Sequence, residues 1–380
     1  MTARLASYWE IGAPPHQPPR DLPRHTDLLI VGAGFLGSWL AYWISKLKPA
    51  WAQRTLVVER DLTGYGASTR NAGFLTAGHV SEMLADEAEC GFDALFAQFL
   101  KRRAGLALTL TEFPDLPTDP CGSADYDEIT DPKRALARRV NGALAARGEA
   151  PAFETRSACL GGSEREVFFS PSDRGVNPMQ LLARLRAAAR AAGVRFAYGV
   201  RAQALSGGKA VLALPAPAGL QELAYGRAWL CVNAFDSELV SRSQIVPGRG
   251  QVLVTSPVQA ATSHHLGFLH DGYDYFKFVD GRLLLGGGRH RFKAQEQTTE
   301  LTPTDEVRQY LLALACTIVG HDRFRIDYNW AGIMGFPQDR HIAISHRTDL
   351  DDTTSTLNAC GGMGVALTPL VARDEVLRLP

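Results

Sequence analysis

The sequence predicts an α/β protein in which a parallel sheet with helical crossovers is combined with a second, mixed-sheet domain of α+β type. Three observations lead to this prediction. A G-x-G-x-x-G turn follows an apolar strand near the N-terminus, and an acidic residue ends the next strand. Strand and helix patterns of the same kind return only after a long interruption, as in a discontinuous first domain with inserted segments.

The glycine-rich turn opens the first strand–helix unit. Residues 28–31 are apolar, as in a buried parallel strand, and residues 35–47 continue as a helix. Gly32 permits the tight turn, Gly34 lets a pyrophosphate approach the backbone, and Gly37 lets the helix pack closely on the sheet. The free N–H groups and positive dipole of the helix N-terminus favour phosphate there.

A second strand at residues 55–58 ends in Glu59, at the distance where a carboxylate accepts hydrogen bonds from an adenosine ribose. The whole unit predicts a dinucleotide site, against the alternative of a chance glycine-rich turn. Residues 64–74 then form a loop of small residues with one arginine. This loop indicates backbone lying against a second part of the cofactor, and its alternative is a plain surface loop.

The later elements follow in order. Asn177 is a good helix N-cap and Gly193 a good C′ residue. We expect helices at residues 80–108, 131–147, 179–192, 306–319 and after 364, and strands at 194–197, 228–232, 251–255, 273–278, 282–285 and 341–345.

Composition narrows the function classes. Forty basic and forty acidic residues balance, so no nucleic-acid partner is expected, and no apolar run is long enough to span a bilayer. The N-terminus has no apolar signal core, so a cytoplasmic location is expected. Six cysteines are scattered singly and His264, His265, His290 and His341 have no metal-ligand spacing, so no metal site is expected.

Several segments resemble the D-amino-acid oxidase superfamily of FAD enzymes: residues 66–73, 175–178, 280–287 and 361–364. Residues 7–9, 232–234 and 250–253 are similar to the γ-glutamylputrescine oxidase branch, near the glycine oxidases. The resemblance implies a Rossmann-like FAD domain of the glutathione-reductase type and a mixed-sheet substrate domain. It places an extended arm at residues 1–26, the FAD domain at 27–82, 172–243 and 326–380, and the substrate domain at 83–171 and 244–325.

The resemblance also implies the cofactor site. FAD would be held non-covalently, because no histidine or cysteine suited to attachment stands near Asn71 and Phe74. A reduced flavin carries negative charge at N1–C2=O, which the N-terminus of the last helix would stabilise. The expected cofactor-binding residues are Gly32, Ala33, Gly34, Phe35, Leu36, Gly37, Glu59, Arg60, Ala67, Ser68, Arg70, Asn71, Ala72, Gly73, Phe74, Val200, Asn233, Ala234, Gly332, Ile333, Gly361, Gly362, Met363, Gly364 and Val365.

The implied reaction is oxidation of the CH–NH bond of an amine or amino acid to an imine by hydride transfer to flavin N5, followed by hydrolysis. Oxygen or another acceptor would then take the electrons. Tyr273, Tyr275 and Lys277 alternate along one expected strand, and Arg289 follows the next; these four are the candidate substrate-side residues, against the alternative of an ordinary amphipathic strand face. An NAD(P)-dependent dehydrogenase and a flavin-binding subunit without turnover are the alternative functions.

Overall fold

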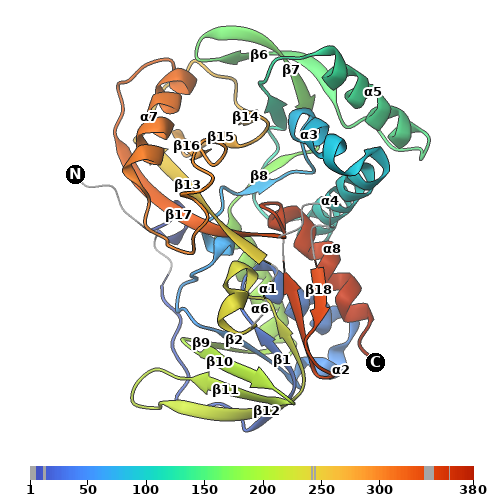
Figure 1. Ribbon diagram of the computed structural model, residues 1–380, viewed down its shortest axis with the longest axis vertical. Coiled ribbons are helices and arrows are strands. Elements are labelled where there is room, and N and C mark those ends of the chain that lie inside the picture. Colours follow the sequence, from blue (N-terminus) through green and yellow to red (C-terminus); the bar gives the residue numbers. More distant parts are fainter. Residues whose placement is uncertain (1–5, 12–13, 241–242, 244, 338–345, 359) are drawn as a thin grey trace.

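The computed structural model describes residues 6–11, 14–240, 243, 245–337, 346–358 and 360–380, and it confirms the α/β class. One sheet carries the parallel strands, at the lower end of Figure 1, and the other is mixed and lies at the upper end. A small sheet of β3 (Phe74–Leu75), β4 (Thr118–Asp119) and β8 (Arg174–Val176) accompanies them.

The parallel sheet is centred on β1 (His25–Val31). This strand lies parallel to β2 (Thr55–Glu59) on one side and to β12 (Leu220–Leu230) on the other. The sheet is completed by two further parallel strands, β9 (Arg195–Tyr198) and β19 (Thr354–Asn358), and by three strands that pair antiparallel to their neighbours, β10 (Arg201–Ser206), β11 (Lys209–Ala213) and β18 (His346–Asp349).

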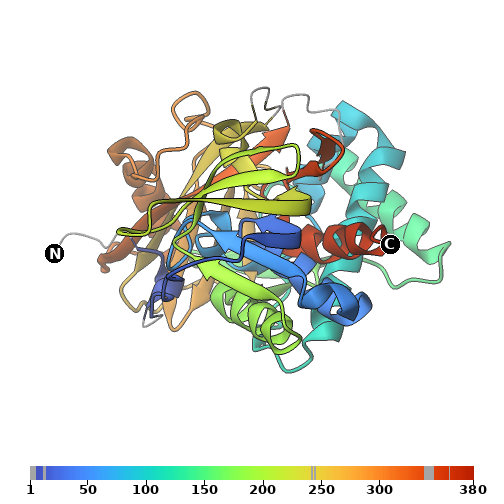
Figure 2. The ribbon, with the colours of Figure 1, turned by 90° about the horizontal axis from the view of Figure 1, so that it is seen from below.

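From Leu28 to Val31, strand β1 is apolar because both of its faces are buried there. Leu28 and Ile30 pack with the helices α1 (Phe35–Leu47), α6 (Pro178–Ala191) and α8 (Gly364–Leu377). Leu29 and Val31 pack on the opposite side, with residues from β10, β11 and β12. Side chains alternate between faces along a strand, so this continuous apolar run feeds two separate cores. Figure 2 shows α8, in red, ending at the C-terminus.

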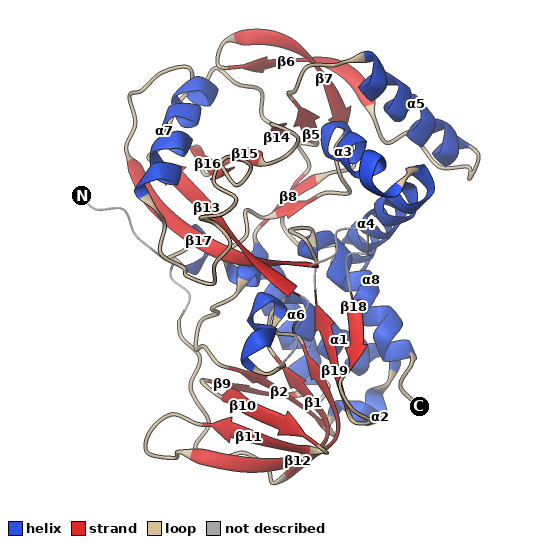
Figure 3. Cartoon of the chain, viewed as in Figure 1, coloured by secondary structure: helices blue, strands red, loops and turns tan. Residues whose placement is uncertain are grey.

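The mixed sheet has the order β17-β13-β16-β15-β14-β5-β7-β6. Its strands are β5 (Ser123–Asp125), β6 (Glu154–Leu160), β7 (Ser163–Ser170), β13 (Ile245–Thr255), β14 (Leu266–Leu269), β15 (Asp274–Val279), β16 (Arg282–Gly287) and β17 (Ile326–Pro337). Helix α7 (Asp305–Val319) packs on it, whereas α3 (Val80–Cys90), α4 (Phe92–Glu112) and α5 (Asp131–Ala145) group together on another side (Figure 3).

Two details of the expected organisation need correction. The boundary at residue 326 precedes β17, which pairs along β13 in the mixed sheet and not with the parallel strands. The β6–β7 hairpin was not expected, because its strands begin with exposed polar residues that give no clear alternation. The strand expected at residues 341–345, including His341, lies outside the described residues.

The extended arm is attached to the folded body through a short 3-10 turn, η1 (Tyr8–Glu10). The Ser7 hydroxyl donates to the Thr69 carbonyl at 2.8 Å, and the Trp9 indole N–H donates to the Asn71 carbonyl at 2.7 Å. Both acceptors belong to the loop that was expected to contact the cofactor. The arm therefore fixes the backbone of that loop.

Candidate functional site

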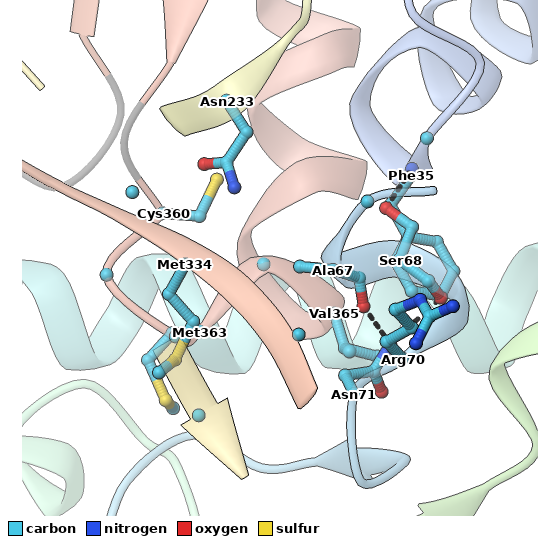
Figure 4. Close-up of a pocket in the computed structure, with 18 of the residues that line it drawn as sticks. Phe35, Ala67, Ser68, Arg70, Asn71, Asn233, Met334, Cys360, Met363 and Val365 are labelled. Carbon is cyan, nitrogen blue, oxygen red and sulfur yellow. Dashed lines mark hydrogen bonds between the residues drawn. The ribbon is translucent and has the colours of Figure 1, made fainter. Parts of the chain in front are cut away.

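A cavity of about 920 Å³ lies where the glycine-rich turn, the 64–74 loop, the C-terminal glycines and the mixed sheet meet. Figure 4 shows Ser68, Arg70 and Asn71 grouped on one side of it, with Met334 and Met363 on the other. Its volume is at the upper end of the range for small-molecule sites. Sequence segments more than 300 residues apart thus line one continuous cavity.

The glycine-rich turn has the geometry that its sequence predicts. Gly32 has φ +103°, and a Cβ there would lie 2.5 Å from the Cys231 carbonyl oxygen. A Cβ on Gly37 would lie 1.9 Å from the Gly32 carbonyl oxygen, so only glycine allows the helix to begin this close. Gly34 lines the cavity, where a Cβ would meet the Ser68 hydroxyl at 2.8 Å.

Most N–H groups of this turn already have acceptors. The Gly32 N–H donates to the Val58 carbonyl, the Ala33 N–H to Glu59 Oε2 at 2.9 Å, and the Phe35 N–H to Ser68 Oγ at 2.8 Å. Gly34 lines the cavity, and within the described part of the chain no acceptor is bonded to its N–H. Glu59 therefore fixes the turn as well as standing at the expected ribose position.

The 64–74 loop is held in shape by its own side chains. The Asn71 amide donates to the Ala67 and Ser68 carbonyls, and its Oδ1 accepts from the Gly73 N–H at 2.8 Å. Arg70 lines the cavity, and its buried Nε has no hydrogen-bond partner among the described residues. Its Nη1 donates to the Ala331 carbonyl at 3.3 Å, so the loop is tied to β17.

The C-terminal glycines form the opposite lip. Gly361 and Gly362 have φ +50° and +88°, conformations that favour glycine, and α8 begins directly afterwards at Gly364. The N-terminus of α8 thus faces the cavity, where its dipole favours negative charge. Gly332 brings β17 close to the loop, since a Cβ there would lie 3.1 Å from Arg70 Cβ.

Most of the expected cofactor-binding residues line this cavity: Gly32, Gly34, Phe35, Leu36, Glu59, Arg60, Ala67, Ser68, Arg70, Asn71, Ala72, Phe74, Val200, Asn233, Gly332, Gly361, Gly362, Met363, Gly364 and Val365. The others lie behind the lining: Ala33, Gly37, Gly73, Ala234 and Ile333. Arg60 is paired with Glu238 at 3.1 Å and packs between the Tyr65 and Phe235 rings. These contacts orient it along the rim.

The substrate-side candidates separate into two groups. Tyr273, Tyr275 and Arg289 line the cavity, and the Arg289 guanidinium lies 3.9 Å from the centre of the Phe336 ring. Burial raises the pKa of Tyr275 to about 12, so its hydroxyl is neutral near pH 7. Tyr273 precedes β15, so only Tyr275 and Lys277 alternate within the strand itself.

Lys277 lies behind the cavity lining. Its Nζ donates to the Gly73 carbonyl at 3.1 Å and the Val176 carbonyl at 3.3 Å, and lies 4.8 Å from the Trp9 ring centre. The side chain is 5% exposed. Burial lowers its pKa to about 7, although nearby negative groups favour the charged form.

Sequence reasoning missed several residues of the cavity lining, among them Arg186 on α6 and an acidic group on α3. Helix α3 contributes Glu82, Asp86 and Glu89, three or four residues apart and so on one helical face. Burial, reinforced by the charge of Glu82, raises the pKa of Asp86 to about 6. Helical periodicity in the sequence reveals that these residues share a face, but not that the face borders a cavity.

His264 and His290, which have no metal-ligand spacing in the sequence, have polar neighbours in space. His264 lies 2.8 Å from Asp119, close to Cys121, and His290 stacks near His270, whose Nδ1 lies 2.6 Å from Asp274. Asp274 also accepts from the Gly288 N–H and the Tyr310 hydroxyl. These contacts join the turn before β15 to β16 and α7.

Two structural grounds support a flavin dinucleotide in the cavity: glycine cradles that a Cβ would fill, and the helix N-termini of α1 and α8. None of the described helices combines the length and apolar character that a membrane span requires.

Comparisons with known proteins agree with this geometry. A family model described as "FAD dependent oxidoreductase" (DAO) matches residues 27–374. FAD-dependent oxidoreductase domain-containing protein 1 of Bos taurus is 34% identical over 102 residues, a match that covers 26% of this chain and 20% of that protein.

Solved structures share the fold at low identity. L-proline dehydrogenase from P. horikoshii has a TM-score of 0.71 at 16% identity, covering 94% of both chains. Glycine oxidase from Geobacillus kaustophilus has 0.68 at 18%, covering 94% of this chain and 96% of that one. L-amino acid deaminase from Proteus vulgaris has 0.70 at 13%, covering 95% of both.

Proposed function

The chain belongs to the DAO family of FAD-dependent oxidoreductases, and we propose that it oxidises the CH–NH bond of a small amine or amino acid. Membership of this family sets aside the NAD(P)-dependent dehydrogenase as a reading of the glycine-rich turn. The structural neighbours are a proline dehydrogenase, a glycine oxidase and an amino acid deaminase, which supports a substrate of this class.

One observation carries the proposal: the residues that would hold FAD and the side chains of the mixed sheet line a single cavity. When bound, FAD supplies the acceptor for a hydride from the carbon next to the nitrogen. The glycine-rich turn would hold the pyrophosphate, and the 64–74 loop and the C-terminal glycines would hold the flavin end. The mixed sheet would cover the reacting face.

The substrate-side residues would bind and orient. Arg289 is suited to a substrate carboxylate, because a guanidinium offers parallel donors to both carboxylate oxygens. The neutral Tyr275 hydroxyl would donate or accept a hydrogen bond, and near pH 7 it would not act as a base. Lys277 would act through the Gly73 and Val176 carbonyls as a positioning residue.

The test is an anaerobic screen of amines and amino acids for loss of flavin absorbance near neutral pH. We expect at least one compound to bleach the flavin fully, while NADH and NADPH do not. Arg289→Met should weaken the response to compounds that carry a carboxylate. Arg291→Met is the matched control, because Arg291 is exposed and lies outside the cavity lining. A flavin that no compound bleaches would favour the flavin-binding subunit without turnover.

A further inference from the structure

We propose that Arg186, from helix α6, is a determinant of FAD pyrophosphate binding that acts from behind the glycine-rich turn. It was not among the residues expected from the sequence. Its position on an Ala- and Arg-rich helix suggests an ordinary surface cation. The structure instead buries the side chain, which is 5% exposed, and Arg186 lines the cavity together with Gly34 and Glu59.

The contacts of Arg186 converge on one peptide group. Its Nη2 donates to the Ala33 carbonyl oxygen, and its Nε donates to Ser38 Oγ at 3.3 Å. Ser38 Oγ donates to the same Ala33 carbonyl at 2.9 Å. Two donors, one of them charged, therefore polarise the peptide that joins Ala33 to Gly34.

The other end of that peptide is the N–H of Gly34, a residue of the cavity lining, and this N–H has no acceptor among the described residues. Hydrogen bonds along a chain strengthen one another, so a cation on the carbonyl makes the N–H a better donor. The peptide transmits the positive charge of Arg186 to the point where a pyrophosphate approaches the backbone.

The charge balance around Arg186 also points to an anionic ligand. In the described part of the chain, no carboxylate forms an ion pair with it, and Arg190 on the same helix opposes its charge. Burial lowers its pKa, while Tyr198 and Glu59 favour the charged form. Glu59 already accepts the Ala33 and Asp61 N–H groups. A buried cation without a paired anion is costly to the protein unless a ligand supplies the charge.

Removing the Arg186 charge should affect the stability of the flavin-free protein and the affinity for FAD in different ways. In Arg186→Met, the full chain stripped of flavin should melt at the same temperature as wild type or higher, because a buried charge is gone. FAD affinity, measured by quenching of flavin fluorescence on reconstitution, should fall at least about tenfold. Arg186→Lys keeps the charge without the forked contacts and should lie between the two. No substrate is needed, so the result is independent of the proposed reaction.

Arg190→Met is the matched control: it removes the same charge from the same helix, at an exposed position outside the cavity. We expect its FAD affinity to equal that of wild type. An equal loss in Arg190→Met would overturn the proposal in favour of a general charge effect. Unchanged FAD affinity in Arg186→Met would overturn it directly. A flavin-free Arg186→Met protein that melts well below wild type would make Arg186 a structural residue only.

Discussion

Replacing Lys277 with methionine should change how the stability of the protein depends on pH. The folded-state pKa of Lys277 is lowered from 10.5 to about 7, chiefly by burial. Between those two values the unfolded chain holds the proton and the folded chain does not, so the wild-type unfolding free energy rises with pH. Below pH 7 the folded protein also holds the proton, and the full cost of burying the charge is present.

The magnitude follows from that window. Each pH unit well above 7 contributes about 1.4 kcal/mol, and less near pH 7, where the folded-state lysine is half protonated. The stability of wild type relative to Lys277→Met should therefore rise by roughly 2 kcal/mol from pH 7 to pH 9. Urea unfolding of wild type and Lys277→Met at pH 7 and pH 9 measures how the difference between their unfolding free energies changes with pH. The tyrosines and cysteines are the same in both proteins, so the contributions of their titration cancel in this difference. A difference that stays constant between pH 7 and 9 would show that Lys277 keeps its proton and refute the burial argument.

Further predictions concern the cofactor and the substrate. Gly34→Ala should abolish FAD retention, because its Cβ would lie 2.8 Å from Ser68 Oγ and intrude on the phosphate position, whereas Glu59→Ala should weaken FAD binding less. The amount of flavin per chain in the purified proteins measures both effects. Full flavin occupancy in Gly34→Ala would count against the assignment of the FAD site. Acid or heat should release all the flavin, so colour left on the denatured chain would reveal a covalent link. Lys277→Met should keep its flavin but lower turnover or reoxidation at least about tenfold, a loss of roughly 1.4 kcal/mol. Unchanged rates in both half-reactions would show that Lys277 takes no part in the reaction.

The sequence predicted best where one residue type satisfies a local geometric demand. Helix α1 has the predicted bounds, Gly32 has φ +103°, and Gly37 stands where a Cβ would collide with the nearby Gly32 carbonyl oxygen. Gly320 ends α7 in the left-handed conformation expected of a C′ glycine. Such demands are local, so they are visible without knowledge of the fold.

Features that depend on which segments meet in space could not be predicted. The same alternation that placed Tyr275 and Lys277 on one face gave no sign that Trp9 covers Lys277, since the arm is more than 250 residues away. The burial of Arg186 follows from the packing of α6 against α1, which the helical pattern of α6 does not specify. For the same reason, the sequence did not indicate that β17 belongs to the mixed sheet. Its place there is seen only from its pairing with β13 in the structure.

The proposed reaction is tested most directly by a single anaerobic turnover with the compound that bleaches the flavin fastest. One equivalent should reduce one equivalent of flavin and release one equivalent of carbonyl product together with ammonia or an amine. Deuterium on the carbon that loses the hydride should slow the reduction. Flavin reduction without a carbonyl product, or with no isotope effect on a reduction shown to be limited by chemistry, would contradict CH–NH oxidation by this protein.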